Sequence, residues 1–385
     1  MLISWASQQP AFRFSPLSLF AASEPGFWFD PSDISTLFQD TAGTTPVTAA
    51  GQSVGLVLDK SKGLVLGPEI ATNGDFSGGN TGWAPQSGWT IASGAASVNS
   101  ATSGSTYIRT TTPTVIGRLY SITFTVTSYT SGSLSAAAGT AISTQAITST
   151  GTFTRYVFAN SVNGAGVYAA STNTIATIDN ISVKELPGNH ASQSTSLSRP
   201  TYQVDSNGRG HLLFDGSDDF LVTPTITPGT DKVQVFTGVR KLSDAARGTV
   251  AELTSSAASN NGAWHLAAPN AASATLAFES KGTALTDAIA SSGVAAPVTA
   301  VVTGIADIGA DTNIIRINGT QVDSDSGDQG TGNFTAAAVY VGRRGGTSLP
   351  FNGRVYSLIC RFGPNLTADQ ITQTEAWVNG KTGAY

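Results

Sequence analysis

Cysteine, histidine and glutamate are scarce in this chain of 385 residues, and each scarcity excludes a class of function. The single cysteine, Cys360, cannot form an intrachain disulfide, and its place in the alternating run 355–360 predicts a strand residue with an inert thiol. The three histidines stand in unrelated contexts. Neither a zinc site nor a Ser-His-Asp triad is therefore indicated.

Charged and long apolar segments are also lacking. Charged residues make up 12% of the chain, the formal net charge is −5 and the sequence pI is ≈ 5.2, so no basic surface for nucleic acid is expected. No apolar run approaches the ~18 residues of a membrane helix. Pro10, Arg13 and Pro16 interrupt the apolar residues near the start, so we expect neither a signal peptide nor membrane insertion.

Glycine is abundant, with 42 positions, and runs of Ser, Thr and Ala suit short strands joined by many turns. The clearest unit is 211–222, in which two apolar segments flank the acidic turn 215–219. This pattern predicts a hairpin of two strands. Asp218 and Asp219 suit a calcium ion, but capping of the turn explains them at less cost.

Residues 67–186 have a texture of their own. Runs such as 119–126 alternate apolar side chains with Ser or Thr at period two, which predicts an antiparallel β-sandwich. The segment opens on Asn-Gly-Asp-Phe at 73–76, contains the Gly-Trp pairs 82–83 and 88–89, and closes on 178–185. In these features it resembles the carbohydrate-binding modules of the family 4/9 jelly-roll type.

That resemblance implies a sugar-binding face and, as an optional cofactor, a structural calcium ion near the first and last strands. Asp75 and Asp179 are the candidate calcium ligands, although Asp179 also suits bonding to backbone amides alone. Trp89 is expected in the core. The aromatic side chains able to stack on a sugar ring are Trp83, Tyr107, Tyr129, Tyr156 and Tyr168.

The segments that flank this module resemble the concanavalin A-like (laminin G-like) sandwich of tail proteins from phages and prophages. The matching pieces are 29–33, 43–48, 59–61, 188–191 and 199–202. Because the module stands between the third and fourth pieces, residues 26–66 and 187–385 are predicted to form one discontinuous sandwich with 67–186 inserted. The expected fold is all-β: two antiparallel jelly-roll sandwiches, one inserted in the other, and a short C-terminal helix.

Three turn and cap signals mark the C-terminal half. Asn318-Gly319 predicts a hairpin turn. Thr367 and Gln370 form a capping box at the start of the helix, and Asn379-Gly380 is expected to end it. The acidic run 323–328 resembles the start of a calcium loop without its last glutamate, so a solvated hairpin end is favoured.

Residues 1–25 hold too many large apolar side chains for a disordered tail. Such a segment either packs on its own globule or docks on a neighbouring subunit. We predict a docking segment, in which the anchoring side chains are Trp5, Phe12, Phe14 and Phe20.

Retaining glycan hydrolases on this architecture need two carboxylates about 5 Å apart, usually on alternate residues of one strand. The six glutamates are scattered instead, so no enzyme is expected. The resemblance implies a virion protein of a tailed phage or prophage, made in the host cytoplasm, that displays sugar-binding sandwiches for attachment to the host. Its expected partners are other virion proteins, copies of itself in a homo-oligomer, with a trimer favoured, and a host surface glycan. The alternatives are a purely structural decoration or fibre protein and a glycan depolymerase.

Overall fold

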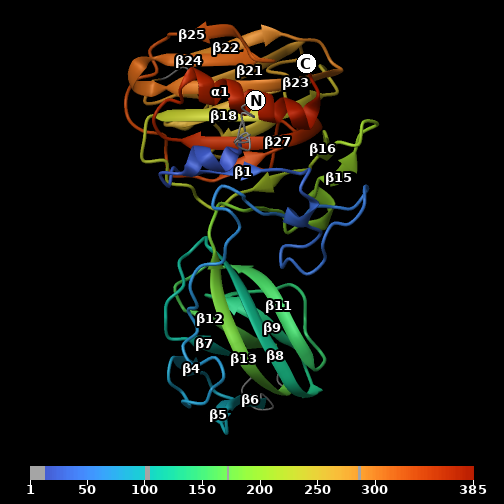
Figure 1. Ribbon diagram of the computed structural model, residues 1–385, viewed down its shortest axis with the longest axis vertical. Coiled ribbons are helices and arrows are strands. Elements are labelled where there is room, and N and C mark those ends of the chain that lie inside the picture. Colours follow the sequence, from blue (N-terminus) through green and yellow to red (C-terminus); the bar gives the residue numbers. More distant parts are fainter. Residues whose placement is uncertain (1–13, 100–104, 171–172, 285–287) are drawn as a thin grey trace, which may run out of the picture.

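The computed structural model describes residues 14–99, 105–170, 173–284 and 288–385. Two antiparallel β-sandwiches are stacked along the long axis of the molecule, and one α-helix lies on the larger of them (Figure 1). The predicted all-β fold with a short C-terminal helix is confirmed. No helix in the described ranges is both long and apolar enough to cross a membrane.

The larger sandwich contains strands from both ends of the chain. Its first sheet comprises β1 (Gly26–Phe29), β15 (Thr201–Val204), β16 (Gly210–Asp215), β18 (Lys232–Lys241), β23 (Val298–Asp307), β24 (Thr312–Ile317), β25 (Thr320–Asp325) and β27 (Asn352–Phe362). Its second sheet comprises β2 (Leu37–Phe38), β3 (Leu56–Val57), β14 (Ala191–Ser192), β17 (Leu221–Val222), β19 (Thr249–Leu253), β20 (Ala263–Ala267), β21 (Thr275–Lys281), β22 (Ala288–Gly293) and β26 (Val339–Val341). Large side chains such as Phe27, Phe214, Trp264 and Phe278 fill the space between the sheets.

The smaller sandwich contains only strands from residues 83–186. One sheet comprises β4 (Trp83–Pro85), β7 (Thr106–Thr110), β9 (Leu134–Ala138), β10 (Ala141–Ile142) and β12 (Ala165–Ala169). The other comprises β5 (Trp89–Ala92), β6 (Ala95–Asn99), β8 (Leu119–Ser131), β11 (Gly151–Phe158) and β13 (Ile175–Leu186). In β8, Ile122, Phe124 and Val126 point inward while the intervening threonines face out, as the alternation predicts.

The chain enters and leaves the smaller sandwich at one place. The amide of Gly67 donates to the carbonyl of Glu185 at 2.8 Å. The two sandwiches meet in an apolar cluster in which Leu56 and Leu58 of the larger body pack with Leu119 and Leu186 of the smaller. The inserted unit therefore has its own core and a small apolar contact with the body that carries it.

A buried carboxylate holds the two ends of the insertion together. Asp59 accepts hydrogen bonds from the amides of Trp28 at 2.8 Å, Ser61 at 2.8 Å and Asn189 at 2.7 Å, and from the hydroxyl of Ser61 at 2.8 Å. Asn189 also donates through its side chain to the carbonyl of Gly26 at 2.7 Å. One side chain thus joins the first strand, the segment before the insertion and the segment after it.

His190 completes this junction. Its Nδ1 accepts a hydrogen bond from the amide of Asp59 at 2.9 Å, so the ring proton is assigned to Nε2, which donates to the carbonyl of Leu186 at 2.9 Å. Burial lowers the pKa of His190. The neutral ring is therefore the form that fits this site.

The segment 211–222 is not the hairpin that its sequence predicts. β16 pairs with β15 and β27 in the first sheet, whereas β17 pairs with β14 and β26 in the second. The acidic turn therefore carries the chain from one sheet to the other. A period-two pattern marks two strands but does not say which strands they pair with, and this explains the error.

Asp219 in this turn is buried, and its Oδ2 accepts a hydrogen bond from the amide of Asp215 at 3.0 Å. Burial, followed by the negative charges of Asp215 and Asp218, raises the pKa of Asp219 to about 7. These three residues are the one cluster of three potential metal-ligating side chains within the described residues. Ser198 and backbone amides already donate to their carboxylates.

The other local predictions for the C-terminal half have mixed outcomes. Asn318 and Gly319 form the β24–β25 turn with φ of 51° and 81°, and the capping box of Thr367 and Gln370 is present. The helix α1 (Ala368–Thr382) does not end at Asn379-Gly380 but continues to Thr382. Gly383 is its C-cap residue and adopts a φ of 59°. Asn379 is a helix residue whose side chain accepts from the amides that follow the helix.

Two aspartates of the acidic run 323–328 join the sheet edges of the larger sandwich. Asp323 and Asp325 of β25 accept hydrogen bonds from the amides of Ser291 and Ile289, each at 2.8 Å. Those amides belong to the edge strand β22 of the opposite sheet. These two aspartates therefore bridge the sheets, whereas Ser324 and residues 326–328 are exposed, as expected of a solvated hairpin end.

The described part of the N-terminal segment packs on its own globule. Phe20 lies in the short helix Pro16–Phe20 and is buried against β1, β27 and α1, where its cluster includes Trp28 and Val378, and Phe14 packs against the same cluster. Because Phe20 is buried in this cluster, its assignment as a docking anchor was wrong, whereas Phe14 is only partly buried and its assignment stays a prediction. Trp5 and Phe12 lie outside the described residues.

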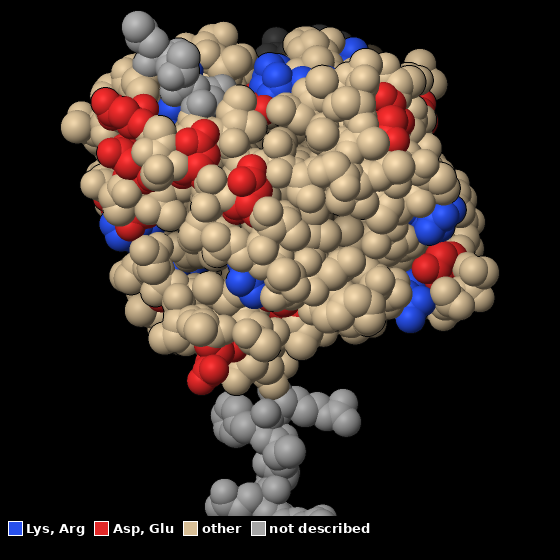
Figure 2. All heavy atoms as spheres, turned by 90° about the horizontal axis from the view of Figure 1, so that it is seen from above, with Lys and Arg blue, Asp and Glu red and all other residues tan. Residues whose placement is uncertain are grey.

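Cys360 is buried in β27, as predicted, and burial raises the pKa of its thiol well above the usual value. Charge is sparse on the outside as well. The end of the larger sandwich remote from the smaller one shows basic and acidic side chains scattered among neutral ones (Figure 2). No large surface of one charge sign is visible at this end.

We expect Asp59→Ala to lower the free energy of unfolding by on the order of 3 kcal/mol or more. Buried amides that lose their acceptor cost about 1–3 kcal/mol each, and the variant leaves the amides of Trp28 and Asn189 without one. Urea denaturation followed by circular dichroism measures the change. Ser61→Ala is the control, since it removes only one hydroxyl donor; equal losses in both variants would contradict this role of Asp59.

Asp219 should make stability depend on pH. Its folded pKa of about 7 lies above the unfolded value of 3.8, so the folded state holds the proton more tightly. Its contribution is therefore most favourable below pH 4 and is lost as pH rises toward 7. Asp219→Asn should be more stable than the parent at pH 8, by on the order of 1 kcal/mol, and lose that advantage near pH 4. Thermal unfolding across this range tests the prediction, and a difference that does not change with pH would refute it.

Candidate functional site

The structure separates the five predicted sugar-binding aromatic residues into core and surface groups. Trp83 is in the core of the smaller sandwich: it is 3% exposed, its ring lies 5.2 Å from that of Phe76, and its Nε1 donates to the carbonyl of Asn73 at 2.9 Å. The prediction that Trp83 binds sugar was therefore wrong. Trp89 is also buried, as expected.

Tyr129 and Tyr156 also make contacts within the protein. The hydroxyl of Tyr129 donates to the carbonyl of Gly132 at 2.7 Å, and its ring packs against the core. Tyr156 lies at the junction of the sandwiches, edge-on to Phe38 with 6.0 Å between ring centroids. A β-carbon at Gly43 would lie 2.2 Å from the ring of Tyr156, so the loop of the larger body covers this tyrosine. The predicted sugar contact of Tyr156 was wrong for that reason, whereas Tyr129 is partly exposed and its sugar contact stays a prediction.

The remaining two tyrosines are brought together. Tyr107 of β7 and Tyr168 of β12 are cross-strand partners, and their ring centroids are 4.8 Å apart with an interplanar angle of 47°. Because Ile108 and Val167 point into the core, these tyrosines point out from the opposite face of the sheet. Both rings are partly exposed. The hydroxyl of Tyr168 donates to the hydroxyl oxygen of Ser105 at 2.8 Å.

Arg109 extends this pair. Its guanidinium carbon lies 3.5 Å from the ring centroid of Tyr107, which is stacking geometry. Its Nε is buried and has no hydrogen-bond partner among the described residues. Burial lowers the pKa of Arg109, although an arginine in this range keeps its charge. We call Tyr107, Arg109 and Tyr168 the tyrosine surface.

Small residues border the tyrosine surface. Gly166 and Ala137 follow Arg109 in register across β12 and β9, and Ser135 follows Tyr168. The side chains of the tyrosine surface therefore project above the shorter side chains that lie next to them on the sheet. Sequence reasoning missed Arg109, although its spacing of two residues from Tyr107 on a predicted strand is a signal that both share a face.

The carboxylates of the two predicted calcium ligands accept hydrogen bonds from residues next to them in the chain. Asp75 accepts hydrogen bonds from the amide of Ser77 at 3.2 Å and from its hydroxyl at 3.0 Å. Asp179 accepts from the amide of Asn180 at 2.7 Å and from its side chain at 3.2 Å. Turn bonds account for both side chains, which is the alternative considered for Asp179.

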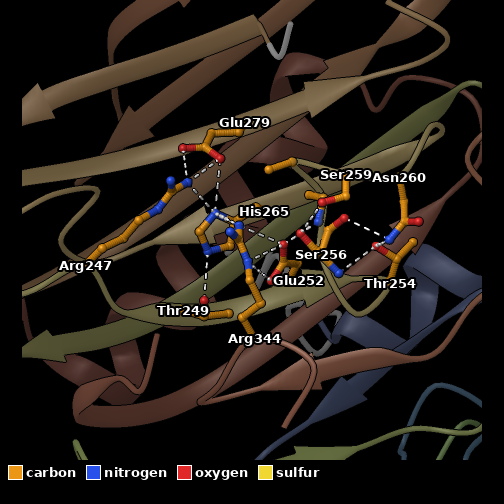
Figure 3. A network of polar contacts seen from close by, with 12 residues as sticks. Arg247, Thr249, Glu252, Thr254, Ser256, Ser259, Asn260, His265, Glu279 and Arg344 are labelled. Carbon is orange, nitrogen blue, oxygen red and sulfur yellow. Dashed lines mark hydrogen bonds and ion pairs between the residues drawn. The ribbon is translucent and has the colours of Figure 1, made fainter. Parts of the chain in front are cut away.

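A buried row of charged residues crosses the second sheet of the larger sandwich (Figure 3). Glu252 of β19, His265 of β20 and Glu279 of β21 are direct cross-strand partners, and all three are buried. Arg247 donates to both oxygens of Glu279 at 2.5 and 2.6 Å, and His265 Nδ1 lies 3.1 Å from Glu279. Burial would raise the pKa of Glu279, but these partners and the charge of Arg344 lower it.

The other end of the row is balanced in the same way. Arg344 Nε lies 3.0 and 2.9 Å from the two carboxylate oxygens of Glu252, which also accepts from the amide of Ala257 at 2.5 Å. His265 Nε2 lies 3.0 Å from the hydroxyl of Thr249. The sequence places Glu252 and Glu279 far apart, and only the register of three strands brings them into one row.

All six glutamates are committed to structural contacts. Five are paired with arginine: Glu24 with Arg361, Glu185 with Arg118, Glu252 with Arg344, Glu279 with Arg247 and Glu375 with Arg316. The sixth, Glu69, accepts from the hydroxyl of Ser182 and the amide of Val183. The lowered pKa of Glu279 is the opposite of what a general acid requires.

Comparisons with known proteins place the chain in no family. No family model and no curated protein matches it. Among solved structures, the binding domain of botulinum neurotoxin DC in complex with rat synaptotagmin II is similar at 13% identity and a TM-score of 0.35, and the alignment covers 49% of each chain. The same domain in complex with SialylT is similar at 12% identity and a TM-score of 0.36, over 49% of this chain and 48% of that chain. Each alignment spans about half of either protein, and similarity at this level carries no argument about function.

We expect Arg344→Gln to lower the free energy of unfolding by about 3–5 kcal/mol, because it leaves the buried charge of Glu252 without its partner. Chemical denaturation gives the value. The matched control is Arg343→Gln, because the Arg343 guanidinium donates to the carbonyl of Thr347 and forms no ion pair among the described residues. Similar losses in the two variants would show that the Glu252 pair is not stabilising.

Proposed function

We propose that this protein is a non-enzymatic, carbohydrate-binding attachment protein carried on the virion of a tailed phage or prophage. The observation that carries the proposal is the tyrosine surface on the outer face of the smaller sandwich. The apolar C–H face of a sugar ring stacks on aromatic rings, and a guanidinium donates hydrogen bonds to hydroxyl groups. Tyr107 and Tyr168 supply the stacking contact with ring centroids 4.8 Å apart, and the guanidinium of Arg109, a residue that is 8% exposed, lies 3.5 Å from the ring centroid of Tyr107.

The arrangement of the two bodies suits display. The smaller sandwich extends from one end of the larger, and only its near end contacts it (Figure 1). A ligand on the outer face of β7 and β12 would therefore not meet the larger body. We propose that several copies, in a trimer or another symmetric assembly with other virion proteins, multiply a weak affinity for host surface glycan.

The state of the carboxylates supports a role without catalysis. The one arrangement that favours a depolymerase is the row in which Glu252 and Glu279 flank His265. Both glutamates are buried and ion-paired with arginine, and the pKa of Glu279 is lowered by its neighbours, which is the opposite of what a general acid requires. The proposed location on a virion rests on the motifs at 29–33, 43–48, 59–61, 188–191 and 199–202.

A glycan array probed with the purified protein tests the proposal. We expect Tyr107→Ala combined with Tyr168→Ala to weaken binding to the retained host polysaccharide by about ten-fold or more, because two stacking partners are lost. Tyr340→Ala is the control: this tyrosine is also partly exposed, but it lies on β26 of the larger sandwich.

Two outcomes would replace the proposal. A parent protein that is retained by no host glycan would support the purely structural alternative. Release of reducing sugar from host polysaccharide would support a depolymerase, with Glu252 and Glu279 as the first residues to substitute.

A further inference from the structure

A second polar site lies on the larger sandwich, away from the tyrosine surface. A groove of 610 Å³ opens between the β15–β16 hairpin and the C-terminal end of α1. Arg209, Arg240 and Arg354 line it together with Asn207, His211 and Tyr356. Its volume is within the roughly 300–1,000 Å³ of sites that hold small molecules.

Two arginines stand side by side at the base of this groove. Arg240 of β18 and Arg354 of β27 are cross-strand partners. Their neighbours Val239 and Val355 point into the core, so both guanidinium groups extend from the outer face of the sheet. Like charges directly opposite one another destabilise a sheet. This pair therefore costs stability unless something negative lies between the two groups.

The protein supplies no carboxylate partner for these two arginines among its described residues. Within the described part of the chain, neither Arg240 nor Arg354 forms an ion pair, and the Nε of each is buried without a hydrogen-bond partner. Arg240 donates to the hydroxyl of Thr299 at 3.0 Å, which leaves its charge uncompensated. By contrast, five other arginines are each paired with a glutamate.

The rim of the groove adds a third positive group. A β-carbon at Gly383 would lie 2.2 Å from Arg209 Nη2, so this guanidinium lies against the C-terminal end of α1, where a cation is favoured. Asp205 is the one acidic residue among those that line the groove. Its carboxylate accepts from the amides of Asn207 at 2.8 Å and Arg209 at 3.0 Å, so it caps the hairpin turn.

The walls are suited to a hydroxylated ligand. His211 and Tyr356 pack together with 4.9 Å between ring centroids, and Tyr356 donates to Asp205 at 3.3 Å. Gln203 and Asn207 also line the groove and carry amide groups that donate to and accept from hydroxyls. Charge at the base and neutral hydrogen-bonding groups on the walls match a small ligand with one anionic end.

We propose that this groove binds the carboxylate of an acidic saccharide, such as a uronic acid unit, between Arg240 and Arg354. Two guanidinium groups recognise a carboxylate through charge-assisted hydrogen bonds, and the ligand relieves the repulsion between them. The anionic character of the ligand follows from the groove alone. Its identity as a saccharide rests on the proposed function.

Calorimetric titration of the full chain at low salt tests the proposal with three probes: an oligogalacturonate, a neutral galactose oligomer and inorganic phosphate. We expect the oligogalacturonate to bind and the neutral oligomer not to bind. Arg240→Gln combined with Arg354→Gln should weaken binding by about ten-fold or more, because each lost charge-assisted contact is a large part of the affinity. Arg343→Gln, which lies outside the groove, should bind like the parent.

The parent protein alone supplies a second measurement, which does not depend on how the double variant folds. Added sodium chloride should weaken the binding of oligogalacturonate, since the interaction is between charges. Failure of the parent to bind, binding that salt does not affect, or full binding by a folded double variant would each overturn the proposal. Phosphate that binds as tightly as the oligogalacturonate, and only when both arginines are present, would overturn the saccharide and leave an oxyanion site.

This test is separable from that of the tyrosine surface. The Tyr107→Ala, Tyr168→Ala variant should keep its affinity for oligogalacturonate, because the groove belongs to the other sandwich. Loss of glycan-array binding in the tyrosine variant and loss of oligogalacturonate binding in the arginine variant therefore report on different sites.

Discussion

The carboxylate of Asp59 lies among backbone segments that are far apart in the sequence, and it bonds to all of them. It receives amides from the first strand, from its own turn and from the residues that follow the insertion. In the unfolded chain water solvates this carboxylate. Inside the protein it is stable only because several N–H groups donate hydrogen bonds to it. The larger sandwich is built from two pieces of chain, and this side chain is where the pieces are held in register.

The glutamate carboxylates, most of which contact arginine, are also satisfied within the protein. With 12% charged residues, the chain has few carboxylates to place, and it places almost every glutamate against an arginine. Two of these pairs lie on a row across the second sheet, and a third ties α1 to β24 through Arg316 and Glu375. Arg240 and Arg354, by contrast, lie directly opposite each other on adjacent strands, and neither forms an ion pair among the described residues.

Local patterns predicted local structure well. The all-β fold, the Asn318-Gly319 turn and the capping box at Thr367 depend on residues close in sequence, and the structure confirms them. Apart from the helix end predicted at Asn379-Gly380, errors arose where contacts distant in sequence decide the outcome. Alternation in 211–222 does not reveal that β16 and β17 belong to different sheets.

The same limit explains the errors in the site. Trp83 is in the core, and a loop of the larger body covers Tyr156, neither of which a sequence pattern can show. Tyr107 and Tyr168 were chosen for their chemistry, but their pairing depends on the register of β7 and β12. Likewise, the row of Glu252, His265 and Glu279 exists only because three strands align.

The hydrogen bond between Gly67 and Glu185 has a consequence for how such a protein can change. Because the chain leaves the larger sandwich and returns to it at one point, the scaffold requires only that the two ends of the inserted unit be neighbours and that the unit meet the apolar cluster around Leu56 and Leu58. A unit that begins and ends on adjacent strands and presents an apolar end meets both requirements. The inserted unit can therefore be exchanged by recombination as a whole, while the core and the Asp59 junction of the scaffold stay unchanged.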